Sequence, residues 1–230
     1  LIIGSCKGAI ADSVAEVVLG QILLGLRRIY ENGEANRKGV ADKPHNLKTL
    51  AGSTIGVIGA SEVGMRVIRY LRMFPCHIVL YDPFCTPKQA EELGVSLKTD
   101  LLELCRVSDV VTLHTPDLPT TYHIMSGEQF RAMKDDAVFI NSSRGRCVDE
   151  VGLIAELEKG RLFAFLDVSY PEPAALDSPL RRLPNVIYNS HIAGPPTVYL
   201  GRQAVDDVEA FVNGKQPLCV IREEDLERIA

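Results

Sequence analysis

The stretch that decides the fold is Gly56-Val57-Ile58-Gly59-Ala60-Ser61-Glu62-Val63-Gly64. It starts inside Thr54–Ile58, a run rich in β-branched residues that predicts a strand. It ends inside the helical pattern of Glu62–Met73. Glycine at this junction allows the sharp turn that a strand needs when it passes directly into a helix. The stretch therefore predicts the first strand–turn–helix unit of an α/β protein.

The same alternation continues towards the carboxyl terminus. Short apolar runs predict strands, and helical patterns lie between them. Strands of this kind are typical of a parallel sheet that helices cover on both faces. We therefore predict a Rossmann-type, doubly wound parallel sheet. The further strands expected are His77–Tyr81, Asp109–Leu113, Ala137–Ile140, Phe163–Asp167 and Val186–Tyr188, and the further helices are Pro87–Leu93, Asp100–Arg106, Asp149–Lys159 and Thr197–Val212.

The segment ahead of this alternation has a different character. We expect a helix that is capped at Asp12-Ser13 and runs to about Glu31, followed by a polar connector over Asn32–Gly52. Apolar side chains cover more than one face of this helix, which predicts burial between two bodies. The expected organisation is an interdomain helix and connector (1–52), a nucleotide-binding Rossmann domain (53–196), and a C-terminal helix and tail (197–230).

Composition excludes several classes of protein. The 230 residues are 46% hydrophobic and 24% charged, which argues against disorder, and the net charge of −5 argues against a nucleic-acid partner. The longest charge-free apolar stretch, Val17–Leu26, is about half of a bilayer span, so we expect no membrane partner. The six cysteines show neither disulfide nor metal-site spacing, which predicts reduced thiols, a cytoplasmic location and no metal.

The glycine-containing stretch indicates dinucleotide binding. Gly59 and Gly64 match the first and third glycines of the fingerprint, which serve the tight turn and helix packing. Ser61 stands at the second position and adds a Cβ where a pyrophosphate must come close. Glu62 adds a negative charge at the helix start, which suits the helix dipole and opposes the pyrophosphate. The alternative is a strand–helix turn without a ligand.

A carboxylate at the end of the second strand strengthens the first interpretation. Asp82 follows Leu80-Tyr81 and lies 18 residues after Gly64. At about this offset an acidic side chain accepts hydrogen bonds from the adenosine ribose. Because it would repel a 2′-phosphate, we expect NAD rather than NADP. The alternative is an aspartate that only starts the turn before Pro83.

Three reactive side chains each follow the carboxyl end of a predicted strand. Arg144 offers a planar fork for a carboxylate. His191 is the natural proton donor and acceptor near neutral pH. Glu172 could hold the imidazole in one tautomer and favour its protonated form. Together they suit reduction of a ketone beside a carboxylate, although each alone is also typical of an ordinary turn, loop or structural residue.

From about Ala11 to Gly214 the chain resembles the D-isomer-specific 2-hydroxyacid dehydrogenase family. The motifs that carry the resemblance are Ser13–Glu16, Gly56–Gly64, Tyr81–Pro83, Ser108–Val111 with His114–Pro116, Asn141–Gly145 with Val148–Glu150, Leu166–Pro173 and His191–Gly194. By this resemblance Arg144 matches the substrate-carboxylate arginine, and Glu172 and His191 match the catalytic pair. The implied NAD-binding residues are Gly59, Ser61, Glu62, Val63, Gly64, Asp82, Thr115, Pro116, Ser142, Ser143, Arg144, Asp167, His191 and Gly194.

The resemblance also implies features beyond this site. The family opens with a flavodoxin-like substrate domain that is largely absent here, and because the chain begins at Leu1 we expect a missing preceding segment. It further implies a small 2-hydroxy or 2-keto acid substrate. In the family the first helix and the C-terminal helix join the two domains, so the tail over 197–230 is expected to return to the substrate domain, and the same region is expected to form a homodimer. Two hypotheses compete with an NAD-dependent dehydrogenase. One is a nucleotide-sensing scaffold like the related corepressors, and the other is a fragment that only binds NAD.

Overall fold

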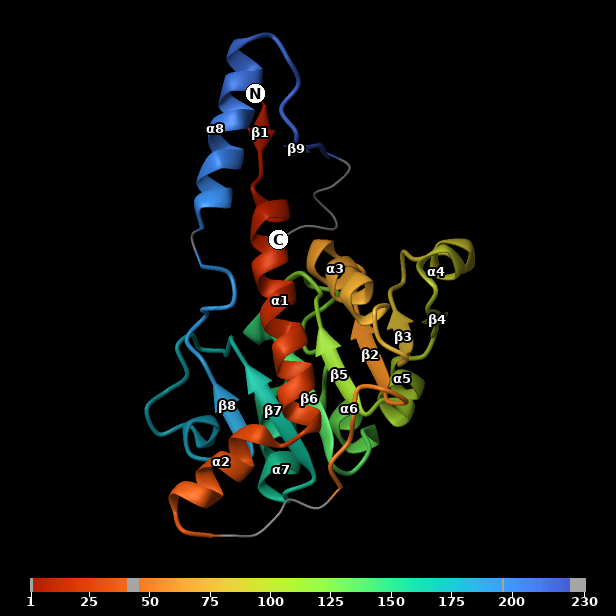
Figure 1. Cartoon of the computed structure of the whole chain (residues 1–230), viewed down its shortest axis with the longest axis vertical. Coiled ribbons are helices and arrows are strands. Elements are labelled where there is room, and N and C mark those ends of the chain that lie inside the picture. Colours follow the sequence, from red (N-terminus) through yellow and green to blue (C-terminus); the bar gives the residue numbers. More distant parts are fainter. Residues whose placement is uncertain (1, 41–45, 196, 224–230) are drawn as a thin grey trace.

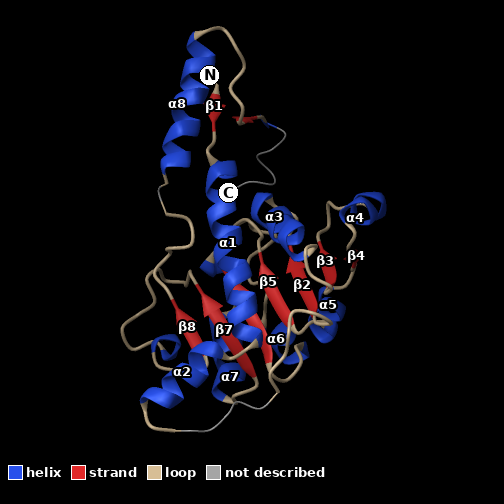
Figure 2. Ribbon diagram, in the orientation of Figure 1, coloured by secondary structure: helices blue, strands red, loops and turns tan. Residues whose placement is uncertain are grey.

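A seven-stranded parallel sheet forms the centre of the computed structural model, which describes residues 2–40, 46–195 and 197–223 (Figures 1 and 2). The strand order is β4-β3-β2-β5-β6-β7-β8. This confirms the predicted Rossmann-type sheet. The strands are β2 (Thr54–Ile58), β3 (His77–Tyr81), β4 (Ser96–Leu97), β5 (Val110–Leu113), β6 (Ala137–Asn141), β7 (Leu162–Leu166) and β8 (Val186–Tyr188).

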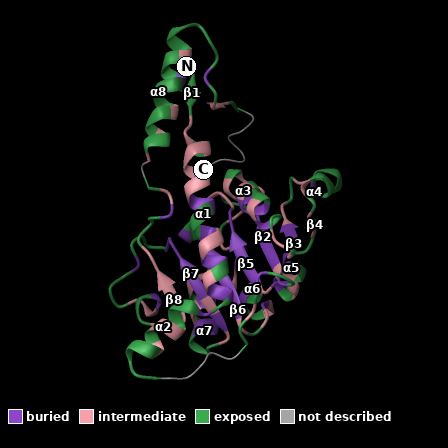
Figure 3. Ribbon diagram, viewed as in Figure 1, coloured by how far each residue is buried: buried purple, intermediate pink, exposed green. Residues whose placement is uncertain are grey.

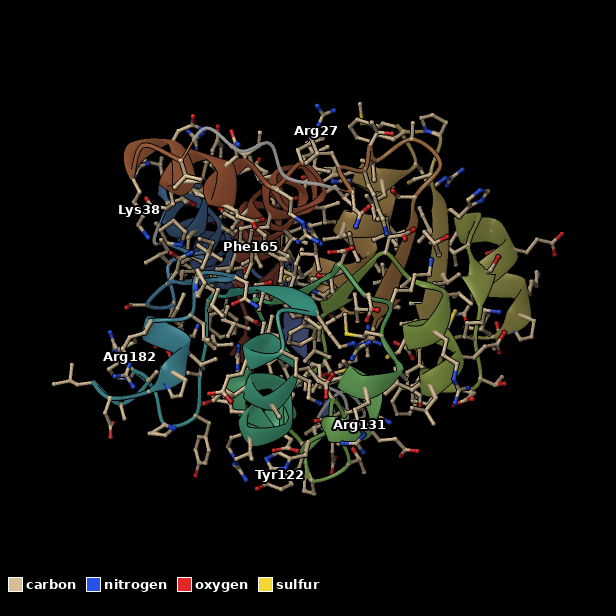
Figure 4. The ribbon with its side chains drawn as sticks, turned by 90° about the horizontal axis from the view of Figure 1, so that it is seen from below. Arg27, Lys38, Tyr122, Arg131, Phe165 and Arg182 are labelled. Atoms are coloured by element: carbon tan, nitrogen blue, oxygen red, sulfur yellow. The ribbon has the colours of Figure 1, made fainter. Side chains whose placement is uncertain are left out.

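Helices cover both faces of this sheet, as a doubly wound fold requires. One layer holds α1 (Lys7–Leu26), α2 (Ile29–Arg37) and α3 (Glu62–Leu71). The other holds α5 (Leu101–Val107), α6 (Gly127–Ala132) and α7 (Glu150–Glu158), and α4 (Pro87–Leu93) lies near the edge strands β3 and β4. In Figure 4 the sheet lies between the two layers, with Phe165 towards α1 and α2 and Arg131 on the opposite side.

The core consists of two apolar clusters that the sheet separates. One lies between the sheet and α5–α7 and includes Leu104, Phe130 and Leu153. The other lies under α1 and α3 and includes Ile22 and Val67. Figure 3 shows the central strands of the sheet buried and the outer helix surfaces exposed. Because both faces of the strands are covered, near-continuous apolar runs such as β5 and β6 are the expected strand sequences.

The order of the strands places a crevice at one edge of the sheet. The chain winds outwards from β2 through β3 to β4, and then returns to β5 on the other side of β2. The turns after β2 and β5 therefore diverge, and ligands of open parallel sheets bind at such a switch point. Gly59 follows β2, and His114 follows β5.

The first helix differs from the prediction at both ends. It begins at Lys7, so Asp12 and Ser13 lie inside α1 and do not cap it. It ends at Leu26, because Arg28 takes a left-handed conformation (φ 51°) and the chain turns into α2. The buried Arg28 guanidinium lies 3.2 Å from the Phe163 ring centre and donates a 2.6 Å hydrogen bond to the Asp136 carbonyl. This tertiary contact breaks a pattern that looks continuous in sequence.

Two further predictions need correction. The predicted connector Asn32–Gly52 begins with helical residues, since α2 continues to Arg37; residues 41–45 lie outside the described part. Helix α6 was not predicted at all. Its capping box, in which Ser126 and Gln129 exchange hydrogen bonds with each other's backbone, is the sequence signal that could have found it.

The two ends of the described chain come together beyond the sheet edge. Strand β1 (Ile3–Gly4) pairs antiparallel with β9 (Val220–Ile221), beside α8 (Val198–Val212) (Figure 1). Gln203 of α8 donates a 3.1 Å hydrogen bond to the Ser5 carbonyl. By length and composition alone, α1 is the one described helix that could cross a membrane, and 44% of its most apolar window is buried in this structure. Here α1 packs that buried side on the sheet.

Candidate active site

The turn between β2 and α3 requires glycine at two places. Gly59 has φ 91°, and a Cβ there would lie 3.0 Å from the His114 carbonyl oxygen. A Cβ on Gly64 would lie 2.1 Å from the Gly59 carbonyl oxygen. Both glycines therefore do what the fingerprint expects, one for the turn and one for close packing of helix on strand.

The serine in this turn causes no conformational difficulty. Ser61 has φ −64° and ψ 177°, an extended conformation that any residue adopts. Its hydroxyl oxygen accepts the Gly64 N–H at 3.4 Å and caps α3. A glycine is therefore not needed here for backbone conformation.

The charge of Glu62 is compensated within the helix layer. Glu62 forms a 2.7 Å ion pair with Arg66, and the Arg66 Nε donates to Asp12 of α1, also at 2.7 Å. Glu62, which departs from the expected motif, thus has its carboxylate paired with a guanidinium one helical turn later. This pairing reduces the repulsion that Glu62 would exert on a bound pyrophosphate.

A cleft of about 710 Å³ opens at the switch point. It brings together five of the predicted cofactor residues, Gly59, Ser61, Asp82, Thr115 and Pro116, and adds others that sequence reasoning missed, including Tyr81, Phe84, His114 and Leu118. His114 is buried, with its Nε2 3.0 Å from Thr112 Oγ1, and burial lowers the pKa of His114 to about 3. The sequence feature that could have indicated His114 as a cleft residue is its position directly after strand β5.

Asp82 is held rigidly at the rim of this cleft. One carboxylate oxygen accepts the Ala60 N–H and the other accepts the Phe84 N–H, both at 2.7 Å. An ionised carboxylate has about four acceptor sites, so two remain for hydroxyl groups of a ligand. The same side chain therefore fixes the glycine turn and keeps acceptor capacity at the cleft.

A second group of predicted residues, Arg144, Glu172 and His191, lies at the same sheet edge. His191 Nδ1 lies 2.6 Å from Glu172 Oε1, and the two side chains are 49% and 39% exposed. Arg144 is exposed, and among the described residues no carboxylate pairs with its guanidinium. These three residues follow β6, β7 and β8, which are neighbours in the sheet.

Asp167 has a clear structural role in this cluster. It is buried, and its two carboxylate oxygens accept the N–H groups of Ile192 and Ala193 at 2.8 and 3.0 Å. Its carbonyl accepts the His191 N–H at 2.7 Å, which helps to hold His191 at φ 56°. Asp167 therefore anchors the loop that presents His191.

The two clusters are joined through the loop after β6. The Ser143 hydroxyl donates to the Thr115 carbonyl, which lines the cleft. Asn141 Nδ2 donates to the Arg144 carbonyl at 3.1 Å and holds the arginine backbone. Gly194, by contrast, packs against α1, where a Cβ would lie 2.8 Å from Ile10.

The residues present fit a dinucleotide. Glu62 and Val63 at the start of α3 carry N–H groups for which the described residues supply no acceptor, and such groups bind phosphate at helix N-termini. The Ser142 hydroxyl oxygen is buried and likewise has no partner in the described part of the chain. In the same residues no cluster of three His, Cys, Asp or Glu side chains is placed to hold a metal ion.

The fold and the cleft together define a dinucleotide-binding domain of the Rossmann class. Residues 19–193 match the family model described as "D-isomer specific 2-hydroxyacid dehydrogenase, NAD binding domain". The chain therefore belongs to the D-isomer specific 2-hydroxyacid dehydrogenase family and contains its NAD-binding domain.

Relatives and solved structures agree with this assignment. The chain is 37% identical over 193 residues to a D-3-phosphoglycerate dehydrogenase of Methanocaldococcus jannaschii, covering 83% of this chain and 37% of the relative. It is 34% identical to a glyoxylate reductase of Thermofilum pendens, covering 96% of this chain and 68% of the relative. It superimposes on D-lactate dehydrogenase with NAD+ from Lactobacillus jensenii with a TM-score of 0.80 at 27% identity, covering 93% of this chain and 69% of that one.

A further similar structure is a D-isomer specific 2-hydroxyacid dehydrogenase from Xanthobacter autotrophicus in complex with NADPH, with a TM-score of 0.81 at 26% identity. The match covers 96% of this chain and 92% of that chain. The chain thus spans about 37% of the length of the phosphoglycerate dehydrogenases and about two thirds of the glyoxylate reductases that it matches.

Proposed function

We propose that this protein is an NAD-dependent D-2-hydroxyacid dehydrogenase that transfers a hydride reversibly between nicotinamide and a small 2-hydroxy or 2-keto acid. The observation that carries the proposal is the 2.6 Å pair of His191 and Glu172 at the same strand edge as Arg144 and the cleft. The names of the relatives, which include phosphoglycerate dehydrogenase and glyoxylate reductase, support this substrate class.

His191 is the proposed acid–base residue. Because Nδ1 faces the Glu172 carboxylate, the other ring nitrogen is left for the substrate. In the oxidation direction Nε2 takes the proton of the substrate hydroxyl while the C2–H electron pair leaves as hydride; in reduction it returns the proton to the carbonyl oxygen. When bound, NAD supplies the hydride acceptor or donor. Glu172 stabilises the imidazolium that exists between these steps.

Arg144 is the proposed substrate-binding residue. A guanidinium remains charged at all relevant pH values and matches a carboxylate with two parallel hydrogen bonds. Its lack of a carboxylate partner among the described residues leaves it available for the substrate. Asp82, the Gly59–Gly64 turn, Thr115 and Pro116 would hold the adenosine and pyrophosphate, and Asp82 favours NAD over NADP.

The test is turnover of a panel of 2-keto acids with NADH. We expect His191→Ala to lower kcat/KM by about 10²–10⁴-fold, the usual contribution of a general acid–base residue, and Arg144→Ala to raise the substrate KM. His77→Ala and Arg182→Ala, exposed on other parts of the chain, serve as matched controls. NADH binding without turnover of any 2-keto acid would overturn the dehydrogenase proposal and favour the hypothesis of a nucleotide-sensing scaffold.

We also propose a homodimer. Val198, Val205, Val208 and Val212 recur at spacings of seven, three and four residues on α8 and are 64–83% exposed. This spacing makes one apolar stripe along the helix. Contiguous exposed apolar surface of this kind marks an interaction site, and a second copy would cover it.

A further inference from the structure

The hydroxyl of Tyr188 forms hydrogen bonds at both ends of the segment that carries Glu172. Tyr188, the last residue of β8, places its hydroxyl 3.0 Å from Ser169 Oγ and 2.9 Å from the Ala174 nitrogen. Ser169 and Ala174 flank Tyr170–Pro173, the stretch in which Glu172 sits. His191 follows Tyr188 by three residues, so the same side chain lies at the base of both catalytic loops.

The direction of each hydrogen bond follows from the inventory of protons. The Ser169 hydroxyl has one proton and donates it to the Pro171 carbonyl at 2.8 Å. Ser169 must therefore accept from the Tyr188 O–H. The Tyr188 oxygen in turn accepts the Ala174 N–H. Each proton is thus used once in this series of hydrogen bonds, which runs from the Ala174 N–H through the Tyr188 and Ser169 hydroxyls to the Pro171 carbonyl.

A neighbouring arginine completes this anchor. Arg181 Nη2 donates to the Ala174 carbonyl at 2.8 Å, and Nε donates to the carbonyls of Ala174 and Ala175 at 3.1 Å. Its guanidinium lies 5.3 Å from the centre of the Tyr188 ring. The residue at the far end of the Glu172 segment is thus held through its N–H by Tyr188 and through its carbonyl by Arg181.

The two ends of the Glu172 segment are buried, Tyr188 is half-buried and Arg181 is exposed, whereas the His191–Glu172 pair is open to solvent. Ser169 is 2% exposed and Ala174 is 4% exposed. Glu172 and His191 are far more exposed, so few packing contacts restrict the carboxylate itself. Its position relative to the imidazole therefore depends on where the ends of its backbone segment are fixed. The two Tyr188 hydrogen bonds, which are partly buried, are suited to fix them.

We propose that Tyr188 is a positioning residue that sets the Glu172 carboxylate against His191 Nδ1. The kinetic part of this inference rests on the proposed function. The positional part does not, because it concerns only residues of this chain. In effect, the Tyr188 hydroxyl determines which tautomer the His191 ring adopts and thereby how well Nε2 exchanges a proton.

The first experiment measures the ring ¹⁵N shifts of His191 by NMR at alkaline pH, where the imidazole is neutral and the shifts distinguish its tautomers. We expect the wild-type protein to show the Nδ1–H tautomer that the Glu172 contact selects. Tyr188→Phe keeps the ring and removes the hydroxyl, so its His191 shifts should resemble those of Glu172→Ala. Tyr30→Phe, in which the altered hydroxyl lies on α2, is the matched control and should retain the wild-type shifts.

The second experiment is steady-state kinetics with NADH and a turned-over 2-keto acid. We expect Tyr188→Phe to lower kcat roughly tenfold, as small misplacement of a catalytic group does, and to leave the KM for NADH unchanged. If Tyr188 had a purely structural role, Tyr188→Phe would lower the melting temperature and would not lower kcat selectively while the KM for NADH stays unchanged. Should Tyr188→Phe fail to fold, Ser169→Ala removes the opposite partner and gives the same two readouts.

The outcomes separate the two proposals. Wild-type His191 shifts in folded Tyr188→Phe, or no preferred tautomer in the wild-type protein, would overturn the positioning role. An absence of turnover with every 2-keto acid, together with a tautomer change in Tyr188→Phe, would overturn the dehydrogenase and retain the positioning role.

Discussion

Asp82 acts on the cleft in two ways at once. Its carboxylate pins the glycine turn through the Ala60 N–H and the following turn through the Phe84 N–H. It also places a fixed negative charge at the rim of the cleft. In the proposed function, a ribose diol would donate hydrogen bonds to this carboxylate, whereas a 2′-phosphate would meet a like charge.

We predict that Asp82→Asn reduces the preference for NADH over NADPH by about tenfold or more, which corresponds to ~1.4 kcal/mol. The reason is loss of the repulsion between the carboxylate and a 2′-phosphate. The measurement is the ratio of kcat/KM for the two cofactors. Glu91→Gln, which neutralises an exposed carboxylate on α4, should leave the ratio unchanged. An unaltered ratio in Asp82→Asn would rule out the ribose role.

His114 makes the stability of the fold dependent on pH. Burial lowers its pKa to about 3, whereas an unfolded histidine titrates near 6.5. Between these values the unfolded chain binds a proton and the folded chain does not. The contribution to stability is therefore fully present above about pH 6.5 and decreases as the pH falls towards 3.

We predict that, because of His114, the free energy of unfolding decreases by up to about 1.4 kcal/mol for each unit by which the pH is lowered in this window. Denaturant unfolding at several pH values measures the slope. His114→Gln should flatten it, and His77→Gln, at an exposed position, should not. If the His114→Gln slope equals that of the wild type, the histidine is not the titrating group.

At the scale of elements, the α3 helix can approach β2 only because Gly64 lacks a side chain. A Cβ would meet backbone, which has no freedom to move away. Gly20 lies in the α1 helix, and no atom outside its own turn lies within 4 Å of the place where a Cβ would stand. The two glycines share a helical backbone and differ only in their tertiary surroundings.

We predict opposite effects of the same substitution at these two positions. Gly64→Ala should destabilise the fold by about 3 kcal/mol or more through the clash, and should weaken NADH binding. Gly20→Ala should stabilise it by about 0.5–1 kcal/mol, since alanine is the better helix residue. Denaturant unfolding and NADH fluorescence titration measure both. Stabilisation by Gly64→Ala would contradict the close packing of α3 on β2.

At the scale of the whole molecule, the rest of the described chain covers only a small part of α8. Figure 3 shows it exposed along most of its length, and its one buried residue, Asp207, accepts the Leu218 N–H at 2.7 Å. The valine stripe of α8 therefore has no described partner in its own chain. Burying such side chains is worth about 1.5–3 kcal/mol each.

We predict that the purified protein is a dimer by light scattering and that Val205→Glu with Val208→Glu gives a monomer. Each substitution puts a charge on the stripe that the second copy would cover. Val151→Glu, at a valine on α7 that is 80% exposed, should leave the dimer intact. A monomeric wild-type protein would refute the homodimer.

The sequence by itself determined the class of fold and the identity of the candidate site residues. Strand runs, helix periodicity and the Gly59–Gly64 spacing are local properties, and a parallel α/β sheet follows from their order along the chain. The carboxyl ends of parallel strands share one edge, so the sequence also predicted that Arg144, Glu172 and His191 lie together.

Only the tertiary structure decided how these residues are held. The break after α1, the burial of His114, the pairing of Arg66 with Asp12 and the Tyr188 anchor all join residues that are distant in sequence or whose surroundings come from other elements. Burial and hydrogen bonding at such places depend on which segments pack together, and no local pattern records that choice. Residue types specify the chemistry, whereas packing specifies its geometry.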